Sequence, residues 1–315
     1  MIIQVYLYDS FTNQIFGGNT AGVVLDATGL GTATMQKIAS ELHAPTTGFV
    51  IGYEAETQPI YLVRYFTPRQ EIDLCGHVTI ALFTALVEKG YCQNKREETR
   101  LGLKTPAGVL SVLLRAGENG SLLVEMEQNQ PYFEPPPKFE GGAVQEALGD
   151  VPLHPFLPVE IASTGLRHLI VPFSRYEDLS GLAPDYDAIK RISQDLKVDT
   201  VCAFAQSVRE PSRVRIRDFC SGIGADEEPA SGTTSGALTS YLFRHGSVPV
   251  NEFGEVRVQV EQGVEMGRPS QIEARLSVQE GNVQRVAVQG QAVLVLEGTI
   301  RIPQEKSRQG SSWIS

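Results

Sequence analysis

Two short stretches of the sequence combine residue types that can bind an anion and move a proton. The first, "DLCGH", places a thiol, a glycine and an imidazole side by side at Cys75, Gly76 and His77, directly before an apolar run. The second, "ASGTTSGAL", places Gly232 among hydroxyl side chains before another apolar run. A helix start presents unpaired N–H groups and about half a positive charge, and glycine lets a ligand approach the backbone. Both stretches therefore predict a site for a carboxylate or a developing enolate oxygen.

The side chains of the first stretch have more than one interpretation. His77 is a candidate proton donor or acceptor because the ordinary pKa of histidine is near 6.5, although a histidine at a helix start can also be a cap. A thiol at a helix start can have a lowered pKa, but a small buried residue is the simpler interpretation of Cys75. We expect the backbone N–H groups that hold a substrate oxygen to belong to Gly76, His77, Gly232 and Thr233.

The elements that must position these stretches occur twice, in the same order. In the first half we expect strands at 2–8, 22–25, 48–51 and 61–66 and helices at 34–42 and 77–89. In the second half we expect strands at 159–161, 167–172, 200–205 and 213–218, a helix at 186–196 and another that ends at Gly246. "RYFTP" from Arg64 matches "RDFCS" from Arg217, and we expect these two arginines to brace the two motifs. This repetition predicts a duplicated fold.

The predicted domains are residues 1–130 and residues 131–315. The best linker candidate is the stretch 130–139, "QPYFEPPPKF", because three successive prolines cannot continue a helix or a central strand. The last strand either stays in the second domain or returns to the first.

Composition narrows the class of partner. The 315 residues carry a net charge of −10, which argues against nucleic acid and anionic membranes as partners. The sequence lacks a membrane-length apolar run and a signal-peptide pattern, so we expect a cytoplasmic protein. Four cysteines without a C-x-x-C pair and five scattered histidines indicate no metal site. Without a G-x-G-x-x-G signature, we expect no nucleotide cofactor.

Five stretches together resemble the PhzF-like family, named for phenazine biosynthesis. They are "FGGNTAGVVL", "RYFTPRQEIDLCGHVTIAL", "STGLRHLIVPF", "GADEEPASGTTSGAL" and "GQAVLVLEGTIRI". The resemblance implies an α+β protein with the diaminopimelate epimerase-like fold. Each of its two similar domains would be a curved, mostly antiparallel β-sheet or barrel around a central helix, with the site between the domains. It also implies a homodimer.

The sequence departs from the family at a residue that carries the chemistry. Family isomerases have the pattern N-x-S-E-T-x-F, in which the Glu is the general acid/base, but here the stretch reads "HAPTTGF" and Thr46 takes that place. A hydroxyl cannot replace a carboxylate as a proton shuttle at neutral pH. The family pattern E-D-P-A-T-G-S appears as "EEPASGT", so Glu228 stands at the Asp and Thr233 at the Ser. His77 matches the histidine of the family.

A two-thiol racemase of this fold is not expected, because the residue before Gly232 is Ser231 and not a cysteine. The resemblance implies instead a cofactor-independent isomerase, tautomerase or cyclase for a small anionic or carbonyl-bearing metabolite, in keeping with specialised metabolism. The catalytic candidates are His77, Glu228 and Thr46. The substrate-binding candidates are Asn19, Cys75, Gly76, Gly165, Ser231, Gly232, Thr233 and Thr234.

The loss of the family carboxylate at Thr46 leaves three alternatives open. Another group performs the proton transfer, or the reaction, for example a cyclisation, needs only positioning and oxyanion stabilisation. In the third alternative the chain is a catalytically silent relative that binds a small molecule.

Overall fold

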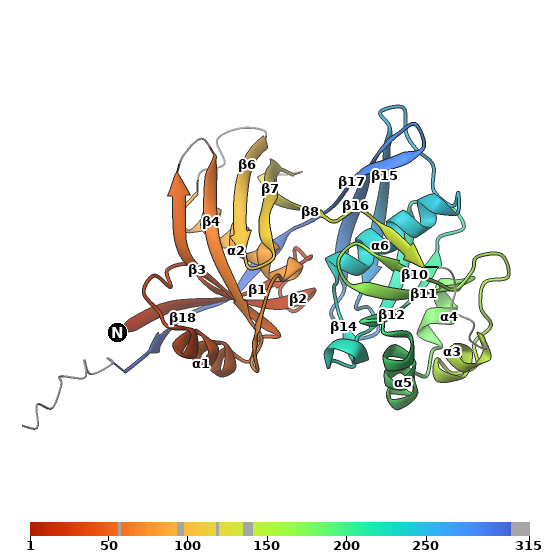
Figure 1. The fold of residues 1–315 in the computed structure, drawn as a ribbon, viewed down its shortest axis with the longest axis horizontal. Helices are drawn as coiled ribbons and strands as arrows, with labels where there is room; N and C mark the ends of the chain where they lie inside the picture. The colour runs from red at the N-terminus through yellow and green to blue at the C-terminus, as the bar shows by residue number, and fades with distance from the viewer. Residues whose placement is uncertain (56–57, 93–97, 118–119, 135–140, 304–315) are drawn as a thin grey trace, which may run out of the picture.

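The computed structural model describes residues 1–55, 58–92, 98–117, 120–134 and 141–303, which form two lobes side by side (Figure 1). The first lobe contains β1 (Ile2–Ser10), β2 (Asn19–Val24), α1 (Thr32–Leu42), β3 (Thr46–Ala55), β4 (Pro59–Phe66), β5 (Glu71–Ile72), α2 (Gly76–Glu88), β6 (Glu98–Thr105), β7 (Gly108–Ala116), β8 (Leu122–Gln128) and β18 (Ala292–Arg301). The second contains β9 (Tyr132–Glu134), α3 (Gly141–Ala147), β10 (Glu160–Ser163), β11 (Arg167–Phe173), α4 (Tyr176–Ser180), α5 (Tyr186–Leu196), β12 (Thr200–Gln206), β13 (Arg213–Phe219), β14 (Glu227–Glu228), α6 (Gly232–Arg244), β15 (Glu255–Gln262), β16 (Ser270–Gln279) and β17 (Asn282–Gly290).

The two lobes repeat one pattern of strand pairing. In the first lobe β2 and β3 are parallel, β3 and β4 are antiparallel, and β4 pairs with the short β5 and in parallel with β6. In the second lobe β11, β12, β13, β14 and β15 pair in the same way. Even the register repeats, since Tyr65 lies opposite Ile72 as Asp218 lies opposite Glu228. The predicted fold class, two similar curved sheets each with a central helix, is confirmed.

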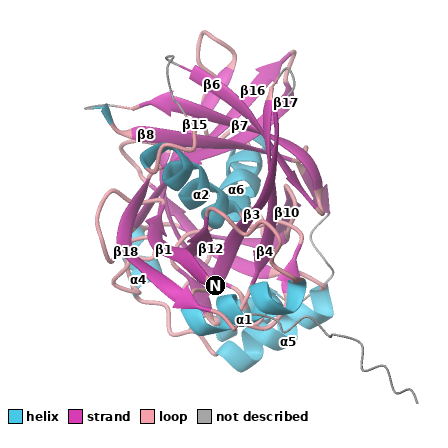
Figure 2. Ribbon diagram, turned by 90° about the vertical axis from the view of Figure 1, so that its left-hand side faces the viewer, coloured by secondary structure: helices cyan, strands magenta, loops and turns pink. Residues whose placement is uncertain are grey.

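The two central helices, α2 and α6, are buried on all sides. Every residue of α2 from His77 to Leu86 is buried, as is the stretch from Thr234 to Leu242 in α6. Their hydroxyl groups are satisfied locally, for example Thr79 Oγ1 by the Cys75 carbonyl at 2.8 Å. The two helices contact each other near the middle of the molecule, with strands around them (Figure 2). Each helix is therefore a rigid support whose start faces the other lobe.

Two strand pairings join the halves of the sequence. β18, the last strand, pairs with β1 from Ile2 opposite Arg301 to Ser10 opposite Ala292, so it lies in the first lobe. β8 pairs with β17, with Val124 opposite Gly290, and this ladder makes the sheets of the two lobes continuous. The sequence patterns did not predict these long-range pairings in detail. The predicted linker 130–139 lies partly outside the described residues, and the boundary near residue 130 stays a prediction.

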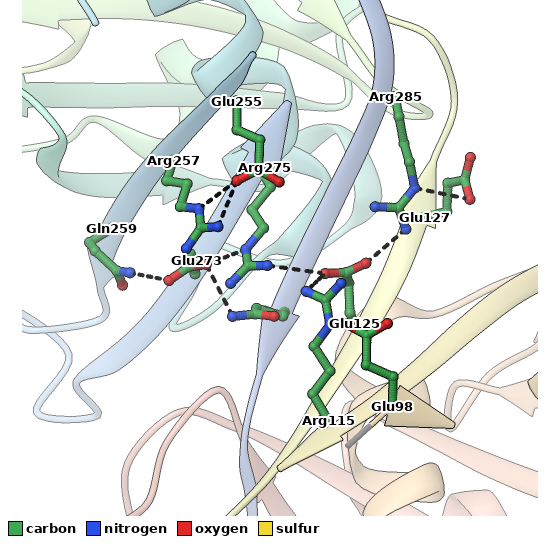
Figure 3. A network of polar contacts seen from close by, with 11 residues as sticks. Glu98, Arg115, Glu125, Glu127, Glu255, Arg257, Gln259, Glu273, Arg275 and Arg285 are labelled. Atoms are coloured by element: carbon green, nitrogen blue, oxygen red, sulfur yellow. Dashed lines mark hydrogen bonds and ion pairs between the residues drawn. The ribbon is translucent and has the colours of Figure 1, made fainter. Parts of the chain in front are cut away.

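A network of ion pairs covers the outer face of this ladder (Figure 3). Its centre is Glu125 on β8, whose side chain is only 1% exposed. Arg115 on β7 approaches it at 2.9 Å, and Arg285 on β17 approaches it at 2.7 Å. A buried carboxylate needs such partners, because the loss of one leaves an uncompensated charge. The network therefore fixes the two lobes relative to each other along one side.

Candidate active site at the starts of the two central helices

The start of α2 brings together three of the predicted site residues. Cys75 precedes the helix, and its sulfur lies 3.4 Å from Nδ1 of His77. Thr46, the first residue of β3, hydrogen-bonds the Cys75 side chain. A methyl group added at Gly76 would meet no described atom within 4 Å, so this helix start faces open space. A hydroxyl, a thiol and an imidazole therefore line one wall of the candidate site.

The start of α6 is held by its own side chains. Ser231 is the N-cap, and its Oγ accepts a hydrogen bond from the backbone of Thr234 at 3.4 Å. The segment before the helix is fixed by the buried amide of Gln262, which accepts from the Ser231 N–H at 2.9 Å and donates to the Glu228 carbonyl at 2.7 Å. The position of Glu228 is thus set by a side chain of β15 that sequence reasoning did not single out.

The two glycine turns differ in the space beside them. A methyl group at Gly232 would lie 3.1 Å from Val288 and 3.5 Å from Phe11, so this side of α6 is packed. A methyl group at Gly165 would lie 3.8 Å from the side chain of Thr233, which places this glycine beside the same helix start. In the direction of an added methyl group, Gly76 therefore has open space and Gly232 is packed.

Contacts between the lobes bring the two helix starts together. The Nδ2 atom of Asn19, a residue that is 1% exposed, donates to the Ala230 carbonyl at 3.1 Å. The Cys75 thiol lies close enough to the Glu228 carboxylate to feel its charge. Thr46, from the first lobe, and Glu228, from the second, therefore both act on the same thiol.

Burial separates the pKa values of the three ionisable groups. It lowers the pKa of His77 to about 4, against a smaller opposite effect of a backbone hydrogen bond with Thr20. Burial also raises the pKa of Cys75 to about 12. The pKa of Glu228 rises to about 7, mainly through burial and then through the charge of Asp218. At neutral pH the thiol and the imidazole are uncharged, and Glu228 is the group of this set that gains and loses a proton.

A buried polar network behind α6 was missed by sequence reasoning. Asp218 is fully buried, and its Oδ2 accepts from Thr234 Oγ1 at 2.6 Å. His168 Nδ1 lies 3.2 Å from the same Thr234 hydroxyl and 2.8 Å from that of Thr200. The "RDF" and "GLRH" stretches contain these two residues, so their membership in the matched motifs was the available signal. Through Thr234 this network connects to the cap of α6.

The two arginines that match between the halves brace the motifs, as predicted. Arg64 donates to both carboxylate oxygens of Glu71 at 2.6 Å. Arg217 donates to both oxygens of Glu227 at 2.9 Å. Each arginine is already paired with both oxygens of its own carboxylate, so we assign neither of them a role in proton transfer.

A groove on the outer face of the molecule is separate from these residues. Its volume is about 400 Å³, and it lies between the β1–β2 loop and the strands β15 to β17. Its lining includes Gln14, Gln259, Gln271 and Gln289 but none of the predicted site residues.

Among the described residues, no cluster of His, Cys, Asp and Glu side chains could hold a metal ion. Within the same residues, no helix has both the length and the apolar character needed to cross a membrane.

Two lobes of one topology, each wound around a buried helix, define the diaminopimelate epimerase-like class of folds. A hydroxyproline epimerase of Agrobacterium vitis has this fold, with a TM-score of 0.57 over 95% of this chain and 91% of that one at 14% identity. The chain belongs to the phenazine biosynthesis-like (PhzF) family, whose model matches residues 8–298. The relatives in this family are named as isomerases, and the chain belongs to that enzyme class.

The relatives cover nearly the whole chain. An uncharacterized isomerase of Deinococcus radiodurans is 37% identical over 295 residues, which are 92% of each chain. The trans-2,3-dihydro-3-hydroxyanthranilate isomerase of Pseudomonas chlororaphis is 33% identical over 303 residues, 93% of this chain and 98% of the relative. The crystal structure of a Bacillus anthracis PhzF-family protein matches with a TM-score of 0.84 at 29% identity, over 96% of this chain and 100% of that one.

Proposed function

We propose that the chain isomerises a small carboxylate- or carbonyl-bearing metabolite without a cofactor, at the starts of α2 and α6. One observation carries the proposal: Cys75 contacts Thr46, which stands where the family has its acid/base Glu, and also feels the charge of Glu228. Glu228 therefore acts by its charge on the thiol next to the position where the family carboxylate is missing, which supports it as the replacement base. Its pKa of about 7 suits a group that both takes and returns a proton at neutral pH.

In the proposed reaction Glu228, as a carboxylate, takes a proton from one carbon of the substrate. The electron pair moves along the conjugated system onto a carbonyl or carboxylate oxygen, and the same carboxyl group then returns the proton to a different carbon. The molecular formula is unchanged. The N–H groups at the open start of α2 hold the charged oxygen, while neutral His77, whose ring is hydrogen-bonded to the Thr20 backbone, lines the site without adding a charge. Thr46 and the protonated thiol of Cys75 contribute polar contacts without a charge.

The alternative of a silent binding protein rests on the same substitution at Thr46. In that case Glu228 and the helix starts hold a ligand, but proton transfer does not follow. A cyclisation promoted mainly by positioning would also tolerate the hydroxyl at this position. Both alternatives keep the same site and differ only in what happens to the bound molecule.

The experiment uses heavy water to separate these cases. The protein is incubated in D₂O with trans-2,3-dihydro-3-hydroxyanthranilate and a panel of small unsaturated carboxylates, and proton NMR follows each compound. We expect an isomer that carries deuterium at a new carbon, with the rate reduced at least about 100-fold in Glu228→Gln. The matched control is Asp226→Asn, which removes an exposed carboxylate two positions away. Binding without exchange would favour the silent alternative, and a rate unchanged in Glu228→Gln would contradict its role.

Assembly and location remain part of the proposal. The family resemblance supports a homodimer, the sequence patterns support a cytoplasmic location, and light scattering at several concentrations tests the dimer.

A further inference from the structure

Arg268, in the loop between β15 and β16, reaches from the second lobe to the first. Its Nη2 atom donates to Asp9 Oδ1 at 2.6 Å and to Thr20 Oγ1 at 2.9 Å. The same atom donates to the carbonyl of Gly17 at 2.8 Å, and Nε donates to that of Gly18 at 2.9 Å. All four acceptors belong to the strands β1 and β2 and the loop between them. One guanidinium of the second lobe therefore binds four acceptors of the first lobe.

The acceptors on the first lobe are themselves fixed. Asp9 is 2% exposed, and its Oδ1 also accepts from the Thr20 hydroxyl at 2.8 Å. Its other oxygen accepts from the backbone of Phe16 at 2.7 Å. A carboxylate this deeply buried depends on its partner charge, so Arg268 and Asp9 hold each other in place.

The loop that carries Arg268 is anchored next to Glu228. The Arg268 N–H donates to the Gly263 carbonyl at 2.9 Å, which closes the loop on itself. Gly263 has a φ of +76°, and a methyl group there would lie 2.7 Å from the carbonyl of Pro229. This glycine therefore packs its backbone against the residue that follows Glu228, and a side chain at Gly263 would push the two segments apart.

The strands β1 and β2, which Arg268 contacts, also hold His77 in place. Ser10 Oγ donates to the His77 carbonyl at 2.7 Å, and the Thr20 backbone hydrogen-bonds the imidazole. Asn19 donates to the Ala230 carbonyl across the lobes at 3.1 Å. The segment that carries these three residues thus contacts the imidazole on one side and the second lobe on the other.

We propose that Arg268 is a positioning residue, which holds the β1–β2 strand pair against the loop beside Glu228 and so keeps the His77 ring buried and the two residues at one site. This inference rests on the proposed function for its catalytic consequence but not for its structural part. The ionisable groups around this part of the site are Cys75 before α2, Glu228 on β14 and Asp9 on β1, and Arg268 itself neutralises Asp9.

The test follows the imidazole of His77 by NMR titration of the free protein, with its resonance identified from a His77→Gln spectrum. In the native chain burial holds the pKa of His77 at about 4. In Arg268→Ala the strand pair is released and water reaches the ring, so we expect this pKa to rise by at least about one unit toward 6.5. Arg268→Lys keeps the charge but loses the fork, and we expect a smaller rise.

The matched control is Arg215→Ala. Arg215 belongs to the same lobe and pairs with one carboxylate, Glu261, at 2.7 Å, within the second lobe. We expect it to leave the pKa of His77 unchanged. If Arg268→Ala does not fold, Thr20→Val is used instead. This variant removes one of the four acceptors that Arg268 binds and keeps the Thr20 backbone that contacts His77. That variant should raise the pKa of His77 by a smaller amount.

An unchanged pKa of His77 in folded Arg268→Ala, or in Thr20→Val where that variant stands in, would overturn the inference. An equal rise in Arg215→Ala would also overturn it, because the effect would then be general loosening. The titration needs no substrate, so it gives its answer even if the proposed isomerase activity fails. Where a substrate is found, Arg268→Ala should lower turnover by roughly 10-fold or more, with partial rescue in Arg268→Lys.

Discussion

Glu228 lies directly opposite Asp218 across the pair of strands β13 and β14, and Asp218 is fully buried. Two carboxyl groups in one buried pair disfavour a second charge, which is one of the causes that keep the pKa of Glu228 near 7. The matching positions in the first lobe hold Tyr65 and Ile72, which carry no carboxylate. The duplicated fold has therefore placed this carboxyl pair in one lobe only.

The first prediction concerns the pH dependence of the reaction. A carboxylate base must be deprotonated, so the rate should rise with pH through about 7, the pKa of Glu228. Asp218→Asn removes the neighbouring negative charge, and the midpoint of this rise should move to lower pH by roughly one unit. The pH–rate profile measures it, and carbon NMR of the Glu228 carboxyl measures it without substrate. A midpoint that stays in place would contradict the coupling of the two carboxyl groups.

The second prediction concerns stability in acid. The pKa of His77 is about 4 in the fold and near 6.5 in an unfolded chain, so the unfolded state binds the proton first as the pH falls. The fold should therefore lose roughly 3 kcal/mol between pH 6.5 and pH 4 because of this residue. His77→Gln should remove that loss, as urea unfolding at pH 7 and pH 4.5 would measure. The control for the loss of one imidazole is His43→Gln at an exposed position. An equal acid sensitivity in His77→Gln and the native chain would contradict the prediction.

The third prediction concerns the thiol of the "DLCGH" motif. Burial raises the pKa of Cys75 to about 12, so this group is neither a thiolate nucleophile nor a base at neutral pH. Cys75→Ser should keep turnover within about tenfold, and iodoacetamide should alkylate the native residue more slowly than a free thiol at pH 7. Rapid alkylation together with loss of activity would mean that the thiol takes part in the chemistry.

The fourth prediction restores the carboxylate of the family. Thr46→Glu would place a second negative charge beside Cys75 and Glu228, and like charges raise the pKa of Glu228. If Glu228 performs the proton transfer, the rate at pH 7 should fall by at least about threefold, whereas Thr46→Gln keeps a similar volume without this effect. If Thr46→Glu instead gains exchange that the native chain lacks, the silent alternative is the better description.

The fifth prediction compares the two braces. The Arg217–Glu227 pair is 9% and 7% exposed, whereas the Arg64–Glu71 pair is 23% and 30% exposed. Removal of one partner leaves the other charge unpaired, and this costs more where water is excluded. Arg217→Ala should therefore destabilise the chain by about 3 kcal/mol and Arg64→Ala by about 1 kcal/mol, measured by urea unfolding. Equal losses would contradict the role of burial.

The sequence predicted only part of the repeated fold. The matched stretches around Arg64 and Arg217 predicted the order of elements up to the two central helices and the two braces, but not the strands β6 to β8 and β15 to β17 that follow those helices. Local patterns could not predict the ladder between β8 and β17, because pairing between distant strands depends on the whole topology. Nor could they find Arg268, whose partners are far away along the chain.

The sequence named the residues of the candidate site but not their pKa values. The motifs named His77 and Glu228, and the ordinary pKa of histidine favoured His77 as the proton carrier. Burial reverses this order, since the pKa of His77 falls and that of Glu228 rises. Nor could the sequence show that Val288 and Phe11 pack beside Gly232 while the space beside Gly76 is open. Burial and packing of this kind depend on neighbours that only the folded chain brings together.

The return of β18 to β1 has a consequence for biosynthesis. A ribosome releases the N-terminal segments first, but the edge of β1 stays uncovered until Ala292–Arg301 has left the exit tunnel. The first lobe thus cannot be completed before the second lobe has been synthesised, and until then the nascent chain carries a bare strand edge, the kind of surface on which chains aggregate. A stop codon just before this strand would therefore damage the lobe that was made first.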